Sequence, residues 1–230
     1  SEDYDVAAVK AVRKAIGPDH DIMADGSMRY HLDLARRMGD FLAEQGVFWF
    51  EEPFAPEDLE LYAALRGTVD IPISAGENEF GLHGFRELVR IKAVDIVQPD
   101  ASRGGGITVV HRVAKLAQEH GLRVAPHTWS DAVAITANAQ VVSAIPNGIT
   151  VEIDRTGTPF VEDLLVEPLT VTNGELQLSD RPGLGIDLNM EVVDRLRTDD
   201  PLSIPEGSYS DMVFGKAYLP PSLPYVEKAS

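Results

Sequence analysis

Six short apolar segments, each followed by a polar residue, recur along the chain at nearly constant intervals. Amphipathic stretches separate them; one, predicted as a helix over residues 31–45, places Leu34, Met38, Phe41 and Leu42 on a single face. Strands that alternate with helices in this way predict right-handed βαβ units and a parallel sheet. The polar residues at the six predicted strand ends, successively 26, 26, 23, 27 and 25 positions apart, are Asp25, Glu51, Glu77, Asp100, His127 and Glu152.

The succession of polar strand ends favours a (β/α) barrel of the TIM type. In such a barrel the C-terminal ends of the strands converge on one mouth, where active sites lie. A doubly wound open sheet would instead spread these positions along an edge. The length of 230 residues is slightly below the roughly 250 that a complete barrel typically needs. We assign residues 1–197 to the barrel domain and residues 198–230 to a tail, rich in Pro, Ser and Gly, that wraps the surface.

Composition excludes several classes of function. The formal charge of −17 disfavours binding to nucleic acid or to an anionic membrane, because phosphate binding needs clustered Lys and Arg. The chain contains no cysteine, so it offers no disulfide, thiolate nucleophile or zinc–thiolate site. No apolar run approaches the roughly 20 residues of a membrane span, and the N-terminus does not resemble a signal peptide. We therefore expect a cytoplasmic protein with a small-molecule partner.

Carboxylates end the first three predicted strands, at Asp25, Glu51 and Glu77. Each one alone is more simply explained as a helix cap or a solvated loop acid. Three on consecutive strands favour a metal site, because Mg²⁺ prefers hard oxygen ligands that face one point. Their neighbours Glu52 and Asn78 are candidates for groups that support the ligands from behind.

Asp100 and His127 end the fourth and fifth predicted strands. A carboxylate that binds one ring nitrogen of a His fixes its tautomer and raises its basicity, as general acid–base catalysis requires. The alternative is a buried, hydrogen-bonded His that is unrelated to Asp100. The remaining histidines fall in predicted loops or helices, and we interpret them as surface or packing residues: His20, His31, His83, His111 and His120.

Other local signals concern the loops and the C-terminal part. The run Gly104-Gly105-Gly106 opens the helix after Asp100 and favours close passage of the backbone, with phosphate binding as the alternative. Residues 171–178, centred on Asn173-Gly174, predict a β-hairpin. Residues 191–197 predict a short helix.

Several motifs, in this order, resemble the mandelate racemase/muconate lactonizing enzyme-like group of the enolase superfamily. They are MADGS, WFEEPF, SAGEN, QPDASRGGGIT, APHTWS, VEIDRTG and the later PGLGIDL. The resemblance covers residues 5–197. It implies a TIM-type barrel whose N-terminal capping domain and first two barrel strands have no counterpart in this chain.

The resemblance also implies a site. It implies Mg²⁺ at Asp25, Glu51 and Glu77, a catalytic His127–Asp100 dyad, and a Glu152 that hydrogen-bonds an enolate oxygen. The shared reaction step of the family is abstraction of a proton α to a carboxylate, with the enolate held on the metal. The pocket neighbours that we add are Tyr30, Trp129 and Arg155.

Two departures from the family pattern matter. The family usually has Asn two residues after the first ligand, whereas this chain has Ser27. The family also carries a Lys base on the second barrel strand, for which this chain has no candidate.

The function expected from these residues is Mg²⁺-dependent dehydration of an acid sugar to a 2-keto-3-deoxy sugar acid. The alternatives are a racemase, epimerase or cycloisomerase on the same site, or an inactive fragment or non-catalytic binding module. The substrate would be a small carboxylate, and we expect the full-length protein to be a homo-oligomer.

Overall fold

The computed structural model describes residues 1–198, so the predicted tail lies almost entirely outside the described residues. The chain forms two compact units. The first contains Ser1–Asn78 and Phe85–Ile96, and the second contains Glu79–Gly84 and the described residues from Val97 onward.

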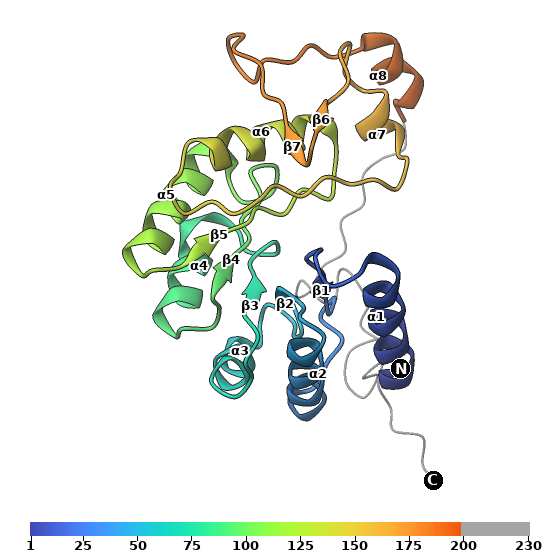
Figure 1. The fold of residues 1–230 in the computed structure, drawn as a ribbon. Coiled ribbons are helices and arrows are strands. Elements are labelled where there is room, and N and C mark those ends of the chain that lie inside the picture. The colour runs from blue at the N-terminus through green and yellow to red at the C-terminus, as the bar shows by residue number, and fades with distance from the viewer. Residues whose placement is uncertain (199–230) are drawn as a thin grey trace. The chain divides into compact units, whose positions relative to one another are not determined.

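Three parallel strands form the centre of the first unit: β1 (Met23–Asp25), β2 (Trp49–Glu51) and β3 (Ile73–Ala75). The register pairs Asp25 with Glu51, and Glu51 with Ser74. The carboxylates that end β1 and β2 are therefore direct neighbours across the sheet. Figure 1 shows the three strands side by side, with the helices over Leu32–Glu44 and Leu59–Arg66 along one side of them.

The helices of the first unit follow from local signals. They are α1 (Glu2–Ile16), α2 (Leu32–Glu44), α3 (Leu59–Arg66) and most of α4 (Gly81–Arg90). At the start of α2, Nδ1 of His31 accepts a hydrogen bond of 3.3 Å from the Leu34 backbone N–H, as an N-cap does. His31 therefore caps α2. Helix α3 begins at Leu59, after a turn in which the Asp58 N–H donates to Ala55 O.

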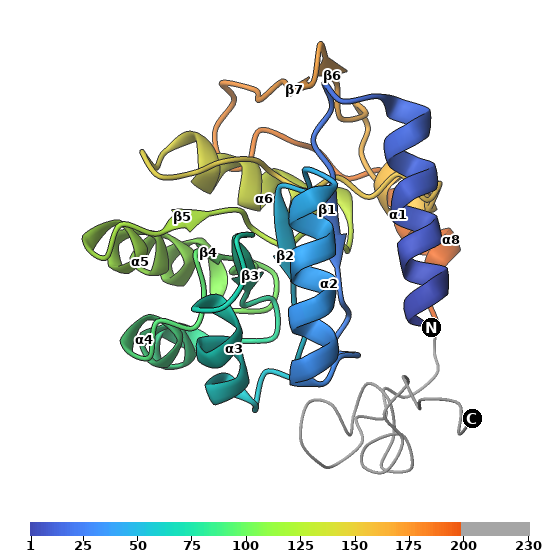
Figure 2. The same ribbon diagram turned by 60° about the horizontal axis from the view of Figure 1, so that its bottom comes forward.

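Helix α1 contacts α2, and the two run side by side (Figure 2). The Arg13 guanidinium on α1 donates hydrogen bonds of 2.9 Å to the carbonyl oxygens of Gln45 and Gly46, just beyond the end of α2. No residue of α1 is buried.

The core of the first unit consists of the inward faces of these helices and the strands. Leu34, Met38 and Leu42 on α2 are buried, as the helical spacing predicted, whereas Phe41 is only partly buried. They belong to one core with the largest buried side chains of the other elements: Phe50, Phe54, Tyr62, Leu65, Ile73, Phe85 and Leu88.

The second unit contains the next strands and helices. They are β5 (Arg123–Val124), α5 (Gly106–Glu119), α6 (Ala132–Ser143), α7 (Pro159–Glu162), β6 (Val171–Thr172), β7 (Glu175–Leu176) and α8 (Met190–Leu196). Strand β4 (Ile96–Val97) contains the boundary between the units. Helices α5 and α6 pack together, with Val110, Val113, Ala114 and Ile135 buried.

One predicted strand is wrong. Residues 150 and 151 are not a strand; the sixth repeat is reduced to an isolated parallel bridge between Val124 and Gly148. The bridge uses the Asn147 carbonyl and the Ile149 N–H, both bonded to Val124, and the chain then leaves the sheet. The predicted hairpin is confirmed: β6 and β7 pair antiparallel around Asn173 and Gly174, whose φ angles of 53° and 81° suit a tight hairpin turn.

Close backbone passage at the glycine run is confirmed. The Gly104 N–H donates to the Asp100 carbonyl at 2.7 Å, and a Cβ on Gly104 would lie 3.0 Å from that same oxygen. This tight loop holds Asp100 at the end of β4. Within the described part of the chain, no helix is long and apolar enough to cross a membrane.

Candidate active site

The carboxylates of Asp25 and Glu51 are each held by a nearby side chain. Asp25 Oδ1 accepts from the Ser27 N–H at 2.6 Å, and Asp25 Oδ2 accepts from the Ser27 hydroxyl at 3.1 Å. Ser27 has a φ of 47°, a left-handed conformation that Asn adopts more readily than Ser. Glu51 Oε2 accepts from the indole N–H of Trp49 at 2.9 Å, because side chains two positions apart share one face of a strand.

Glu52 is a buried acid near Asp25, Glu51 and Glu77. It is 3% exposed, and its Oε2 accepts from the Asn78 amide at 2.6 Å. The same amide lies 3.5 Å from Glu77 Oε1, so Asn78 connects the two acids. Burial raises the pKa of Glu52 well above its usual value, and the negative charges of Glu77, Glu51 and Asp25 raise it further. The charges of these three acids therefore act on the buried Glu52 carboxyl group.

A divalent cation fits this set by donor type. The three strand-end acids supply hard oxygen atoms, two of them stand opposite each other in the sheet, and their combined charge acts on Glu52. In residues 1–198, however, no three His, Asp or Glu side chains are gathered closely enough to hold a metal ion as they stand. Their oxygens instead accept hydrogen bonds from Ser27, Trp49 and Asn78. The assignment of Mg²⁺ therefore remains a proposal.

In the second unit, His127 and Asp100 form a buried pair. Nδ1 of His127 lies 2.9 Å from Oδ2 of Asp100, and the two residues are 7% and 1% exposed. An ionised carboxylate only accepts hydrogen bonds, so Nδ1 carries the proton and the lone pair of the neutral ring lies on Nε2. The hydrogen bond that the sequence predicted is present.

The second oxygen of Asp100 has its own set of donors. Oδ1 accepts from the N–H and hydroxyl of Ser102, both at 2.8 Å, and from the Asn138 amide at 3.0 Å. Burial raises the pKa of Asp100, but the hydrogen bonds from His127, Ser102 and Asn138 outweigh burial and bring the net pKa below its usual value. Asp100 is thus held as an anion.

Glu152 is anchored next to this pair. Its Oε2 accepts from the Thr128 N–H at 2.8 Å, and the Thr128 hydroxyl donates to the Glu152 carbonyl. Because Thr128 directly follows His127, the sixth strand-end residue is tied to the segment that carries the dyad.

Two of the three predicted pocket neighbours make side-chain contacts of their own, and the third, Trp129, is largely exposed. The Tyr30 hydroxyl lies 3.4 Å from Asp5 Oδ2 on α1, and its ring meets Phe50 edge-on. Trp129 is 62% exposed, and the Arg155 guanidinium forms an exposed ion pair of 3.5 Å with Glu162. A role for them beside a substrate stays a prediction.

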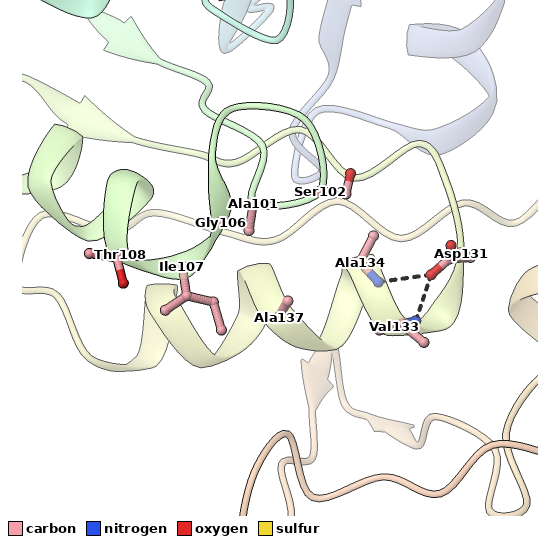
Figure 3. Close-up of a pocket in the computed structure, with 9 residues that line it drawn as sticks. All are labelled: Ala101, Ser102, Gly106, Ile107, Thr108, Asp131, Val133, Ala134 and Ala137. Atoms are coloured by element: carbon pink, nitrogen blue, oxygen red, sulfur yellow. Dashed lines mark hydrogen bonds between the residues drawn. The ribbon is translucent and has the colours of Figure 1, made fainter. Parts of the chain in front are cut away.

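A hollow of about 410 Å³ lies between the loop after β4 and the first half of α6 (Figure 3). Ala101 and Ser102 line it from the loop, and Ala134 and Ala137 line it from the helix. Asp131 caps α6 by accepting from the N–H groups of Val133 and Ala134 at 2.8 and 2.9 Å. The small residues on this face of α6 let the helix approach the Asp100 loop closely.

Three supporting residues were not predicted from the sequence: Ser102 and Asn138, which bond to the dyad, and Thr128, which bonds to Glu152. Ser102 was detectable, because a Ser two residues after an Asp commonly bonds back to it. Asn138 was also detectable, because it is an amide with low helix propensity within an otherwise apolar helix.

Comparison with known proteins now identifies the family. The model of the enolase C-terminal domain-like family matches residues 1–192, and the chain belongs to this family. Its relatives are enzymes of the mandelate racemase/muconate lactonizing enzyme group, whose barrels are of the TIM type. The barrel class expected from the strand ends is therefore confirmed.

Two curated relatives illustrate the reactions in this family. The D-galactarolactone cycloisomerase of Agrobacterium fabrum is 40% identical over 86% of this chain and 54% of its own length. The D-xylonate dehydratase of Haloferax volcanii is 33% identical over 84% of this chain and 47% of its own length. The chain thus spans about half the length of the curated relatives it matches.

Solved structures of similar proteins support the same family assignment. The 3,6-anhydro-D-galactonate cycloisomerase of Zobellia galactanivorans is similar with a TM-score of 0.81 at 36% identity, over 85% of this chain and 55% of the other. A Bradyrhizobium enolase complexed with magnesium and mandelic acid is similar with a TM-score of 0.77 at 32% identity, over 85% of this chain and 51% of the other.

Proposed function

We propose that the complete enzyme containing this chain removes the proton α to the carboxylate of an acid sugar and then expels an oxygen from the β carbon. The observation that carries this proposal is the buried His127–Asp100 hydrogen bond of 2.9 Å. It supplies an oriented imidazole with a defined protonated nitrogen, which is what a general base requires. Family membership supports the reaction class.

His127 is the proposed base. With Nδ1–H directed at Asp100, Nε2 carries the lone pair that accepts the substrate proton. The imidazolium that results is stabilised by the carboxylate of Asp100, whose lowered pKa keeps it charged. The same Nε2–H can then protonate the departing β oxygen, so the proton that His127 takes up leaves with the product.

Mg²⁺ is the proposed cofactor, and Asp25, Glu51 and Glu77 would hold it. When bound, it would supply a Lewis acid that stabilises negative charge on the substrate carboxylate, which the weakly acidic α-proton makes necessary. Support comes from the oxygen donors on neighbouring strands and from the similar Bradyrhizobium enolase with magnesium. Asn78 and Glu52 would keep Glu77 oriented, and Glu152, anchored by Thr128, would face the developing oxyanion.

The leaving oxygen decides between two outcomes. If it is a hydroxyl group, elimination releases water and gives an enol that tautomerises to a 2-keto-3-deoxy acid, which is the dehydration expected from the sequence. If the oxygen belongs to a lactone or anhydro ring, the same elimination opens the ring and releases nothing. Two cycloisomerases, 40% and 36% identical to this chain, favour ring opening as a second candidate. The D-xylonate dehydratase, 33% identical, supports the release of water.

A product screen tests the proposal. The complete enzyme with Mg²⁺ is incubated with a panel of acid sugars, their lactones and anhydro acids, and products are analysed by NMR and mass spectrometry. Dehydration lowers the product mass by one water, whereas ring opening leaves the mass unchanged. His127→Asn serves as the control for contaminating activities. A panel in which no acid sugar or cyclic derivative is consumed would contradict the proposed function.

A further inference from the structure

Asn138 stands at the meeting point of three segments of the second unit. It lies in α6 and is 0% exposed. Its Nδ2 lies 3.0 Å from Asp100 Oδ1 and 3.2 Å from the carbonyl oxygen of His127. Its Oδ1 accepts a hydrogen bond of 3.0 Å from the Ala101 N–H. One side chain therefore binds the acid of the dyad, the main chain next to that acid, and the main chain of the base.

This arrangement is unusual for helix packing. The rest of α6 is mostly apolar, and a buried amide is tolerated only where its donors and acceptor find partners. The helix itself offers the Ala134 carbonyl at 3.2 Å, which would satisfy only part of the amide. The remaining hydrogen bonds all lead to the dyad and its loop, so the amide is explained by the dyad rather than by the helix.

We propose that Asn138 is a positioning residue that holds Asp100 and His127 in register with each other. By binding Oδ1, it fixes the rotation of the Asp100 carboxylate, so that Oδ2 faces Nδ1 of His127. By binding the His127 carbonyl, it fixes the main chain from which the imidazole projects. This inference rests on the proposed function only in assigning the dyad to catalysis.

Ser102 cannot replace Asn138 in this role. Ser102 also donates to Oδ1, but it lies only two residues after Asp100 and therefore belongs to the same loop. Asn138 lies 38 residues from Asp100 and 11 residues from His127 and comes from a packed helix. Among these donors, Asn138 bonds to both members of the pair.

The test compares two variants of α6. Asn138→Leu keeps the approximate size of the side chain and removes its hydrogen bonds. Thr136→Val is the matched control: Thr136 is 2% exposed, and its hydroxyl donates at 2.7 Å to Ala132 O within the same helix, without touching the dyad. Glu152, which reaches the neighbouring segment through Thr128, is unchanged in both.

The main readout is the titration and tautomer of His127, measured by ¹H–¹⁵N NMR in the complete enzyme and assigned with His127→Asn. Loss of the oriented carboxylate disfavours the imidazolium, so Asn138→Leu should lower the midpoint of His127 by about one pH unit and reduce the Nδ1–H tautomer. Turnover should fall about tenfold or more, with KM within about twofold. Thr136→Val should change neither the midpoint nor the tautomer.

Equal titration of His127 in both variants would overturn the proposal and leave Asn138 as a packing residue. If Asn138→Leu does not fold, the unmodified enzyme supplies the test: the side-chain NH₂ signals of Asn138 should shift with the same midpoint as His127, and signals that ignore this titration would overturn it. An inert enzyme whose His127 still depends on Asn138 would contradict the proposed function alone. An active enzyme whose His127 ignores Asn138 would contradict the positioning role alone.

Discussion

His127 and Asp100 meet through one defined pair of atoms, Nδ1 and Oδ2, at 2.9 Å, while the other oxygen of Asp100 is bound by Ser102 and Asn138. One oxygen of the carboxylate thus binds the proposed base, and the other binds the residues that hold Asp100 in place. An Asp arranged in this way orients the imidazole without transferring a proton itself.

The dyad should behave as a unit in kinetics. General acid–base catalysis contributes about 10²–10⁴-fold, so His127→Asn should lower kcat by at least that order. Asp100→Asn should also lower kcat, because the substituted amide orients the ring without stabilising its charge. The double variant should lose less than the product of the two single effects. Multiplicative losses would show that the two residues act independently.

Metal binding should depend on the strand-end acids of the first unit. In calorimetric titration of the complete enzyme with Mg²⁺, Glu51→Gln should abolish detectable binding, because it removes a charged oxygen donor. Glu60→Gln changes an exposed acid in the first turn of α3 and is the control. His127→Asn should leave the affinity intact. Unchanged Mg²⁺ affinity in Glu51→Gln would refute the ligand assignment.

Asp100 should contribute stability that depends on pH. Its pKa in the folded state is below the unfolded value of about 3.9, so the contribution is fully present above that value and is lost as the pH falls through the folded pKa. The difference in free energy of unfolding between the unmodified enzyme and Asp100→Asn should therefore shrink below about pH 4. Urea unfolding at several pH values measures it. A difference that grows on acidification would contradict the direction of the pKa shift.

Much of the fold was predictable because its signals are local. The spacing of Leu34, Met38 and Leu42 predicted the buried face of α2, and Asn173-Gly174 predicted the hairpin turn. The sixth strand was not predictable in this way. Whether residues 150 and 151 pair depends on how far the chain follows Val124 after the bridge at Gly148, and this is decided by tertiary contacts.

The candidate site likewise combines features that could be predicted from the sequence with features that depend on tertiary contacts. The pairing of His127 with Asp100 was implied by the resemblance of the QPDASRGGGIT and APHTWS motifs to the family, and the structure contains the hydrogen bond. The partners of Asn138 could not be predicted, because a polar residue within an apolar helix signals that partners exist without indicating which ones. The conformations of Asp25 and Glu51 also depend on side chains, Ser27 and Trp49, whose hydrogen bonds the motif does not specify.

The most direct test of the account is exchange of the substrate α-proton in D₂O. With a substrate identified by the product screen and with Mg²⁺, NMR follows both exchange at the α carbon and formation of product in the unmodified enzyme and in His127→Asn. We expect His127→Asn to retain Mg²⁺ binding but to lose exchange and elimination together, because Nε2 of His127 is the proposed proton acceptor. Exchange that continues at the unmodified rate in His127→Asn would contradict this assignment.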